Sequence, residues 1–133
     1  MLQVEDIHTY YDESHALQGV SLEVRTGEVV CLLGRNGAGK STTLKSIMGL
    51  TPPRRGRIRF DGEEIQGRPP HWIARRGIAL VPEDRRIFAG LTVRENLEVA
   101  MPPRPAGERR WPIERIFDEY PMLAELRDQD GGT

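Results

Sequence analysis

The chain has little of several features that would assign it to a specialised class of protein. Only one of its 133 residues is a cysteine, which excludes a disulfide framework within the chain and is typical of a reducing cytoplasm. Its 19 basic residues are balanced by 20 acidic ones, so there is no global positive field to attract nucleic acid. No apolar run approaches the roughly 20 residues that a membrane-spanning helix needs. The length is nevertheless sufficient for one domain with a core.

Runs of apolar residues predict several strands in the first part of the chain. Residues 19–25 and 57–60 alternate apolar and polar side chains, which is the pattern of half-buried strands. Residues 29–33 and 78–81 are apolar throughout. This pattern predicts strands that are covered on both faces, as in a parallel sheet.

The stretch that follows the first continuous apolar run predicts a short helix over 40–48. Leu44, Ile47 and Met48 fall on one face of this helix, and we expect that face to pack into the core. Gly49 is expected to end the helix, because glycine readily takes the left-handed conformation at that position.

The remaining helices are expected further along the chain. A short helix over 70–76 is expected behind a Pro-Pro pair. Thr92 and Glu95 have the spacing of a capping box, which predicts a helix over 93–101. Residues 102–110 contain three prolines and are expected to form a loop. An apolar stripe at helical spacing predicts one more packed helix, and its members are Ile113, Ile116, Phe117 and Tyr120.

Residues 34–41 fit the pattern G-x-x-x-x-G-K-[ST] between an expected strand and an expected helix. The first N–H groups of a helix have no partner and the helix dipole is positive there, so a loop folded over that end can hold an anion. Glycines permit the backbone angles and the close approach that a Cβ would prevent. Lys40 can place its charge against the β- and γ-phosphates, and Ser41 can give its hydroxyl to Mg²⁺. The motif therefore predicts a site for a nucleoside triphosphate with Mg²⁺.

The alternative interpretation is a glycine-rich turn before a helix, with Lys40 merely solvated. Four fixed positions match by chance in a chain of this length with odds on the order of one in a few hundred. The strand and helix expected on either side supply the context that the motif requires. We therefore favour the nucleotide site.

The residues around this motif resemble the ATP-binding cassette (ABC) family along the whole chain. "GRNGAGKSTTLKSIMGL" is similar to the Walker A segment of that family, "ALQGVSLEVRTGEVVCLLG" to the strands before it, and "GRIRFDGEEI" to its β-hairpin. "VPEDRRIF" followed by "LTVRENL" is most similar to ATP-binding subunits of branched-chain amino acid importers, and urea importers share much of it. The resemblance implies the N-terminal portion of an α/β, P-loop NTPase fold. Its parts would be an antiparallel β subdomain, a Walker A strand–loop–helix unit and the start of a helical subdomain.

The resemblance also implies roles for individual residues in binding ATP and Mg²⁺. Tyr11, or in second place Tyr10, would stack on adenine; the alternative for each is a half-exposed strand residue. Glu83 stands where most of the family has glutamine, and it would contact Mg²⁺ or hold a water, with Ser41 as the other metal-binding residue. The phosphate site would consist of Gly34, Arg35, Asn36, Gly37, Ala38, Gly39, Lys40, Ser41 and Thr42.

Partners and location also follow from the resemblance. Subunits of this type are cytoplasmic and lie peripherally on the inner face of the cell membrane. They dimerise with a second ATP-binding subunit and bind transmembrane permease subunits, while a periplasmic solute-binding protein is an indirect partner. Nucleic acid is not expected as a partner.

We expect residues 1–133 to be the N-terminal part of an ATP-binding domain, ending just before the signature loop. In the family, the signature loop, Walker B with its catalytic glutamate and the switch histidine come later, so no catalytic residue is expected within these residues. His8, His15 and His71 lie upstream and are expected to be surface or hairpin histidines. The family hydrolyses ATP, but the 133 residues alone are expected to be inactive.

Two functional interpretations stay open. The first is the ATPase subunit of an importer of branched-chain amino acids, or of urea, other amides or other amino acids. The second is a nucleotide-binding protein that never turns over ATP. A P-loop kinase or GTPase is disfavoured, because neither a kinase-type lid nor the base-reading motifs of GTPases are visible.

Overall fold

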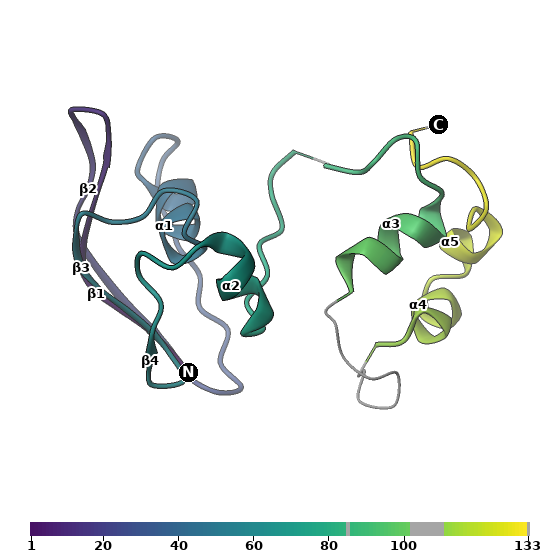
Figure 1. The fold of residues 1–133 in the computed structure, drawn as a ribbon, viewed down its shortest axis with the longest axis horizontal. Helices are drawn as coiled ribbons and strands as arrows, with labels where there is room; N and C mark the ends of the chain where they lie inside the picture. Colours follow the sequence, from purple (N-terminus) through teal and green to yellow (C-terminus); the bar gives the residue numbers. More distant parts are fainter. Residues whose placement is uncertain (85, 102–110, 133) are drawn as a thin grey trace. The chain divides into compact units, whose positions relative to one another are not determined.

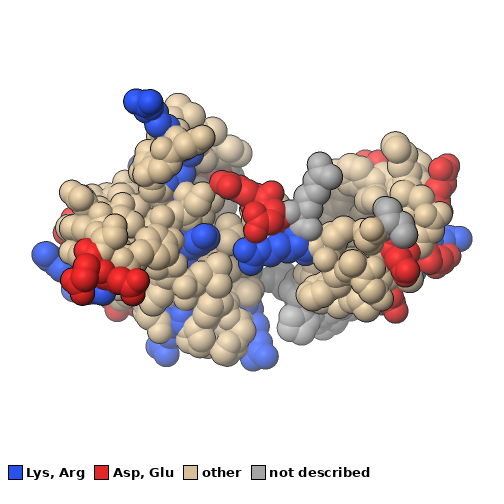
Figure 2. Space-filling model, turned by 90° about the horizontal axis from the view of Figure 1, so that it is seen from above, with Lys and Arg blue, Asp and Glu red and all other residues tan. Residues whose placement is uncertain are grey.

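The computed structural model describes residues 1–84, 86–101 and 111–132. They form two compact units, Met1–Leu80 and Val81–Thr133 (Figure 1). No helix among the described residues is long and apolar enough to cross a membrane. On the face drawn in Figure 2, basic and acidic side chains are interspersed, as the near balance of charge in the sequence leads one to expect.

The first unit is built on a four-stranded antiparallel sheet with the order β2-β1-β3-β4. The strands are β1 (Leu2–Tyr11), β2 (Ser14–Val24), β3 (Arg55–Phe60) and β4 (Glu63–Glu64). Asp61 and Gly62 join β3 to β4 with φ values of 49° and 83°, the conformation that Asp-Gly turns favour. The strands predicted over 19–25 and 57–60 are confirmed, and both begin earlier than predicted.

Strand β1 departs from regular pairing near Asp6. Its register with β2 and with β3 shifts around this residue, which has a φ of 46°. Gly56 of β3 lies opposite, with a φ of 95°. A Cβ on Gly56 would lie 2.4 Å from the carbonyl oxygen of Asp6, so the backbones approach more closely than any other residue permits.

A helix packs against the sheet (Figure 1). This helix, α1 (Lys40–Ile47), buries Thr43, Ser46 and Ile47. Ser46 meets β1, where its hydroxyl lies 2.8 Å from that of Thr9. The core of the unit consists of Val4, Ile7, Leu17, Ile47, Met48, Ile58, Ile65 and Ile73, the last from α2 (Pro70–Arg75).

The buried face of α1 differs from the predicted one. Leu44 is 43% exposed, whereas its neighbour Thr43 is buried. The buried hydroxyls are satisfied locally, because that of Thr43 donates to the carbonyl of Gly39 and that of Ser46 donates to the carbonyl of Thr42. An apolar stripe was expected, but hydroxyls with partners occupy part of the inward face instead. Gly49 ends the helix as predicted, with a φ of 72°.

The strands predicted over 29–33 and 78–81 are not formed. Both segments lack regular secondary structure, and Val29, Leu33 and Val81 are exposed by 90%, 93% and 90%. A continuous apolar strand is stable only when neighbouring strands accept its N–H and C=O groups and other elements cover its faces. No strand among the described residues pairs with either segment. The strand of the predicted strand–loop–helix unit is therefore absent, while its loop and helix are present.

The second unit contains α3 (Val93–Ala100), α4 (Ile113–Glu119) and α5 (Pro121–Glu125). The predicted capping box is confirmed: the N–H of Glu95 donates to the Thr92 hydroxyl at 3.2 Å, and the N–H of Thr92 donates to the Glu95 carboxylate at 2.8 Å. The N–H and the hydroxyl of Thr92 both donate to the Glu95 carboxylate, which favours its ionised form and lowers the pKa of Glu95. The helix ends at Ala100, one residue before the predicted end.

Helix α4 forms where the apolar stripe predicted it, but the stripe is only partly buried. Ile113 and Phe117 are buried, Ile116 is half-buried, and Tyr120 is 57% exposed. The helix ends at Glu119, and Tyr120 has a φ of −124°. Pro121 follows Tyr120, and a residue before a proline disfavours the helical conformation. The loop predicted over 102–110 lies outside the described residues.

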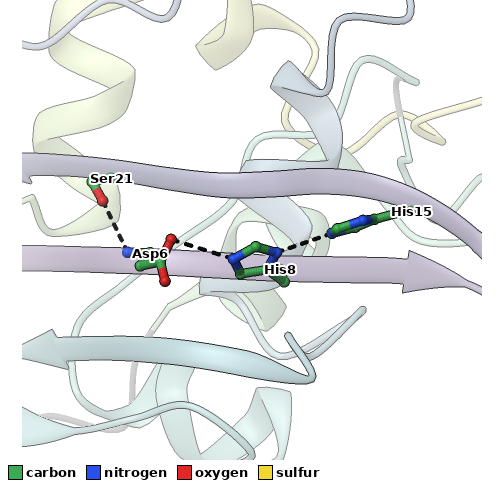
Figure 3. A network of polar contacts seen from close by, with 4 residues as sticks. All are labelled: Asp6, His8, His15 and Ser21. Atoms are coloured by element: carbon green, nitrogen blue, oxygen red, sulfur yellow. Dashed lines mark hydrogen bonds and ion pairs between the residues drawn. The ribbon is translucent and has the colours of Figure 1, made fainter.

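A polar network crosses from β1 to β2 (Figure 3). His8 Nδ1 lies 3.0 Å from His15 Nε2, and His8 Nε2 lies 3.3 Å from a carboxylate oxygen of Asp6. The N–H of Asp6 donates to the Ser21 hydroxyl at 2.9 Å. Both histidines are half-buried hairpin residues, whereas His71 is exposed on α2, so the prediction of surface or hairpin histidines is confirmed. No pattern of residues predicted the network itself.

Candidate functional site

The loop of residues 34–39 leads directly into α1, as predicted. Gly39 precedes the helix with a φ of 95° and no side chain caps the helix end. The first N–H groups of α1 therefore keep their capacity to bind an anion. The loop residues from 34 to 38 are exposed, so a ligand can reach the backbone.

The glycines of this loop lie where neighbouring side chains are close or where the backbone conformation favours glycine. A Cβ on Gly34 would lie 3.1 Å from the Cβ of Ala38, and one on Gly39 would lie 2.7 Å from a methyl group of Leu17. A Cβ on Gly37 would meet nothing within 4 Å, but the φ of 81° at this residue favours glycine. The loop thus has the bare backbone that a phosphate group requires.

The side chain of Lys40 folds back over the loop. Its Nζ donates to the carbonyl oxygens of Gly34 at 2.6 Å and Arg35 at 2.8 Å. The loop is closed further by the N–H of Ala38, which donates to the carbonyl of Arg35 at 3.1 Å. A positive charge therefore lies directly over the glycine loop, at the end of α1 where the helix dipole is also positive.

Tyr11 lies beside the first turns of α1. It is the last residue of β1, it is 44% exposed, and its hydroxyl lies 3.5 Å from that of Thr42. Hydrogen bonds with Thr42 and Thr51, with a smaller contribution from the charge of Lys45, lower the pKa of Tyr11. The Tyr11 hydroxyl is therefore in contact with Thr42, while part of the residue is exposed and accessible to a ligand.

Tyr10 has different surroundings. Its ring stacks on that of His15, with the centroids 4.2 Å apart and the planes 7° from parallel. The guanidinium of Arg54 lies 4.6 Å from the centre of the Tyr10 ring. The structure therefore brings Tyr11 to the first turn of α1, while Tyr10 packs against other side chains.

The two residues expected to bind metal lie in different units. Ser41 is exposed in the first turn of α1, where a hydroxyl oxygen suits Mg²⁺. Glu83 is exposed in the unit Val81–Thr133, so its approach to Ser41 stays a prediction. Within the described ranges, no three His, Cys, Asp or Glu side chains gather as a metal site. Binding of Mg²⁺ at Ser41 would therefore depend on oxygens from a bound phosphate.

Thr51 and Arg54 contact the surroundings of Tyr11, and sequence reasoning did not identify either. Thr51 helps to lower the pKa of Tyr11, and Arg54 Nη2 donates to the carbonyl of Asp12, the next residue after Tyr11, at 2.8 Å. These contacts join residues about 40 positions apart in the chain. No local pattern could have indicated them, because their geometry follows from how β1, α1 and β3 pack together.

A family model, curated proteins and solved structures all match this chain. The family model described as "ABC transporter" matches residues 17–130. The chain is 41% identical, over its whole length, to the high-affinity branched-chain amino acid transport ATP-binding protein BraG of Pseudomonas aeruginosa, of which it covers 57%. It is 37% identical to the lipopolysaccharide export system ATP-binding protein LptB of Haemophilus influenzae, over 98% of this chain and 55% of that protein.

A solved ATP-binding subunit of an ABC transporter superposes with a TM-score of 0.81 at 35% identity, over 98% of this chain and 54% of that one. The chain therefore spans a little over half the length of the relatives that it matches.

Proposed function

Because the chain belongs to the ABC transporter family, we propose that it binds ATP with Mg²⁺ at the glycine loop. The observation that carries this proposal is the arrangement around α1. An uncapped helix end, a loop of bare backbone and the Nζ of Lys40 converge on one place. Tyr11 lies next to it, with its hydroxyl on Thr42.

Each predicted residue has a role in this proposal. The backbone from Gly34 to Thr42 holds the phosphates, and Lys40 turns from the loop carbonyls to the β- and γ-phosphate oxygens. By resemblance to the family, Ser41 and Glu83 would each contribute an oxygen to a Mg²⁺ ion, which would neutralise negative charge on the phosphates. Tyr11 offers its ring to adenine, because an aromatic ring stacks on any base.

The experiment that tests this proposal is a series of ligands measured by titration calorimetry. We expect affinity to rise from AMP through ADP to ATP with Mg²⁺, because each added phosphate gains contacts with the loop and Lys40. Inorganic triphosphate should bind as well, since the loop recognises the phosphates alone. If AMP binds as tightly as ATP, the ligand is not held by the glycine loop and the proposal is wrong.

We further propose that the protein is the ATP-hydrolysing subunit of an importer of branched-chain amino acids. The 41% identity to BraG over the whole chain supports this substrate class. The 37% identity to LptB makes lipopolysaccharide export the second candidate, and urea import the third by resemblance of its motifs. Uptake of labelled leucine, uptake of labelled urea and the amount of lipopolysaccharide at the cell surface would be measured in cells that carry Lys40→Ala. Loss of leucine uptake alone is the expected result.

As a subunit of such a transporter, the protein would act in the cytoplasm, bound peripherally to the inner face of the membrane. It would pair with a second ATP-binding subunit and with permease subunits, and a periplasmic solute-binding protein would deliver the solute. The second unit offers a surface for the permease, an apolar groove with a volume of about 510 Å³. Its lining includes Ile87, Phe88, Val93, Leu97 and Val99.

The wall of this groove is held in place by Asn96. The N–H of Phe88 donates to the Asn96 side chain at 2.8 Å, and the same side chain donates back to the carbonyl of Phe88 at 3.0 Å. The ring of Phe88 stays 59% exposed. A fixed backbone with an exposed apolar ring suits an amphipathic helix of a permease.

Co-purification with the permease subunits tests the groove. Phe88→Asp should abolish co-purification and leave ATP binding unchanged, because Phe88 lies outside the glycine loop. Met122→Asp is the matched control, since Met122 is 78% exposed and does not line the groove. If Phe88→Asp co-purifies as well as Met122→Asp, the groove is not the permease surface.

A further inference from the structure

We propose that Arg54 is a positioning residue for recognition of the base: it holds the turn between β1 and β2 so that Tyr11 faces adenine. The proposal rests on the proposed binding of ATP at the glycine loop. Arg54 itself touches neither the glycine loop nor, in this proposal, the nucleotide. It acts through the two residues on either side of Tyr11.

Arg54 contacts the residue before Tyr11 and the residue after it. Its guanidinium donates from Nη2 to the carbonyl of Asp12 at 2.8 Å and lies 4.6 Å from the centre of the Tyr10 ring. Its own N–H donates to the carbonyl of His8 at 2.8 Å, which fixes the start of this side chain against β1. A planar guanidinium can stack on an aromatic ring and donate from its edge at the same time.

The bond from Arg54 is made to the residue that turns the chain between β1 and β2. Asp12 has a φ of 50°, in the left-handed region that Asp adopts in turns more readily than most residues other than glycine. The bond from Arg54 Nη2 to the Asp12 carbonyl adds a long-range contact that favours this one conformation of the turn.

The same segment of chain holds Tyr11 from its other end. The Tyr11 hydroxyl lies 3.5 Å from that of Thr42 of α1, and Thr51, three residues before Arg54, helps to lower the pKa of Tyr11. The connection between α1 and β3 therefore influences the phenol as well as the turn that carries it. Because Thr42 also belongs to the expected phosphate site, this connection links the position of the base to that of the phosphates.

The Tyr10 ring on which Arg54 stacks is itself supported from its other neighbours. His15 stacks on Tyr10, and His15 is bonded to His8, which is bonded to Asp6 (Figure 3). These contacts between side chains connect β1 to β2 as far as the turn. Arg54 contacts Tyr10 and also donates to Asp12 in the turn, so it connects these side chains to the turn.

The test compares ATP with inorganic triphosphate in the full-length protein, by titration calorimetry on Arg54→Ala and Arg54→Lys. We expect Arg54→Ala to weaken ATP roughly five- to tenfold, less than the loss of a direct charged hydrogen bond because Arg54 acts through Tyr11, and to leave inorganic triphosphate unchanged. Arg54→Lys keeps the charge over Tyr10 and should restore part of the loss. It also supplies the measurement if Arg54→Ala does not fold. Arg57→Ala, which removes another arginine three residues further along in β3, is the matched control and should change neither ligand.

A double variant shows whether Arg54 acts through Tyr11. In a Tyr11→Ala background, Arg54→Ala should cause no further loss of ATP affinity. A further loss of the same size, an equal loss of both ligands, or no loss at all would overturn the proposal. Failure of the proposed function gives a different result, because inorganic triphosphate would then bind Lys40→Ala as well as the unaltered protein.

Discussion

The Nζ of Lys40 lies 2.6 Å from the carbonyl oxygen of Gly34. Gly34 is the first residue of the glycine loop, and Lys40 is the first residue after it. The lysine therefore takes its acceptors from the loop backbone, with the carbonyl of Arg35 as the second at 2.8 Å. An anion that enters the loop would offer Lys40 charged oxygens as hydrogen-bond acceptors in place of these carbonyl oxygens. The ammonium group already lies within the loop, so little reorganisation is needed for this exchange.

Lys40→Ala should weaken ATP and inorganic triphosphate alike. Removal of a charge-assisted hydrogen bond costs about 1.5–3 kcal/mol, which is roughly a ten- to hundredfold loss of affinity. Titration calorimetry on both ligands measures this loss. Arg57→Ala removes a positive charge from β3 and serves as the control for a general electrostatic effect. Equal weakening by both substitutions would mean that Lys40 has no specific contact with phosphate.

Tyr11→Ala should weaken ATP but not inorganic triphosphate. Stacking of a base on an aromatic ring is worth about 1–3 kcal/mol, and inorganic triphosphate has no base to lose. Tyr11→Phe keeps the ring and removes only the hydroxyl contact with Thr42, so it should lose less than Tyr11→Ala. If Tyr11→Ala reduces the affinity for both ligands equally, the adenine assignment is wrong.

The glycine loop and helix α1 could be predicted from the sequence because the information is local. Residues 34–41 specify the motif, and the capping box of Thr92 and Glu95 likewise depends on neighbours within one turn. Pairing of strands is different. The run over 29–33 has the composition of a buried strand, but a strand needs partners, and the described residues supply none.

The surroundings of Tyr11 could be predicted only in part. The resemblance of the sequence to the family indicated Tyr11. It did not indicate that Thr42 and Thr51 lower the pKa of Tyr11, or that Arg54 contacts Asp12. Those contacts depend on bulges in β1 and on where the connection after α1 returns to the sheet. Spacing in the sequence carries no signal for such packing.

Gly56→Ala should destabilise the first unit severely. A Cβ at this position would lie within 2.6 Å of three backbone atoms of β1, and the φ of 95° adds about 1–2 kcal/mol for a residue other than glycine. Thermal unfolding measures the change. Gly62→Ala is the matched control, because Gly62 has a φ of 83° but no atom within 4 Å of its Cβ position. Similar losses from both would show that strain in φ, and not the close approach of β1 and β3, requires glycine at 56.

The capping box of α3 should make the second unit sensitive to acid. The hydrogen bonds from Thr92 lower the pKa of Glu95 below its ordinary value of 4.5, so the folded state favours the carboxylate. The resulting stabilisation is complete above the ordinary pKa and is lost as the pH falls through the lowered pKa of the folded state. Unfolding in urea at a series of pH values below 6 measures it.

Two substitutions separate the parts of this cap. Thr92→Ala removes the hydroxyl that accepts from the N–H of Glu95, and it should cost about 1 kcal/mol at neutral pH. Glu95→Gln keeps an acceptor for the Thr92 N–H but does not titrate, so it should flatten the acid dependence. An acid transition that is unchanged in Glu95→Gln would assign the sensitivity to another carboxylate.

Residues 1–133, expressed alone, should release no phosphate from ATP above the level of a Lys40→Ala control. The glycine loop can bind a triphosphate, but binding alone does not stabilise the attack of water. That step needs a positioned base and charge stabilisation on the far side of the γ-phosphate. By resemblance to the family, the base follows Walker B and the far side is covered by the signature loop of a partner subunit, and we identify neither within these residues. A longer chain that contains both should hydrolyse ATP only as a dimer, so its rate per subunit should rise with concentration. Turnover that depends on Lys40 in residues 1–133 alone would show that the catalytic groups are already present, and the assignment of this segment as a binding half would be wrong.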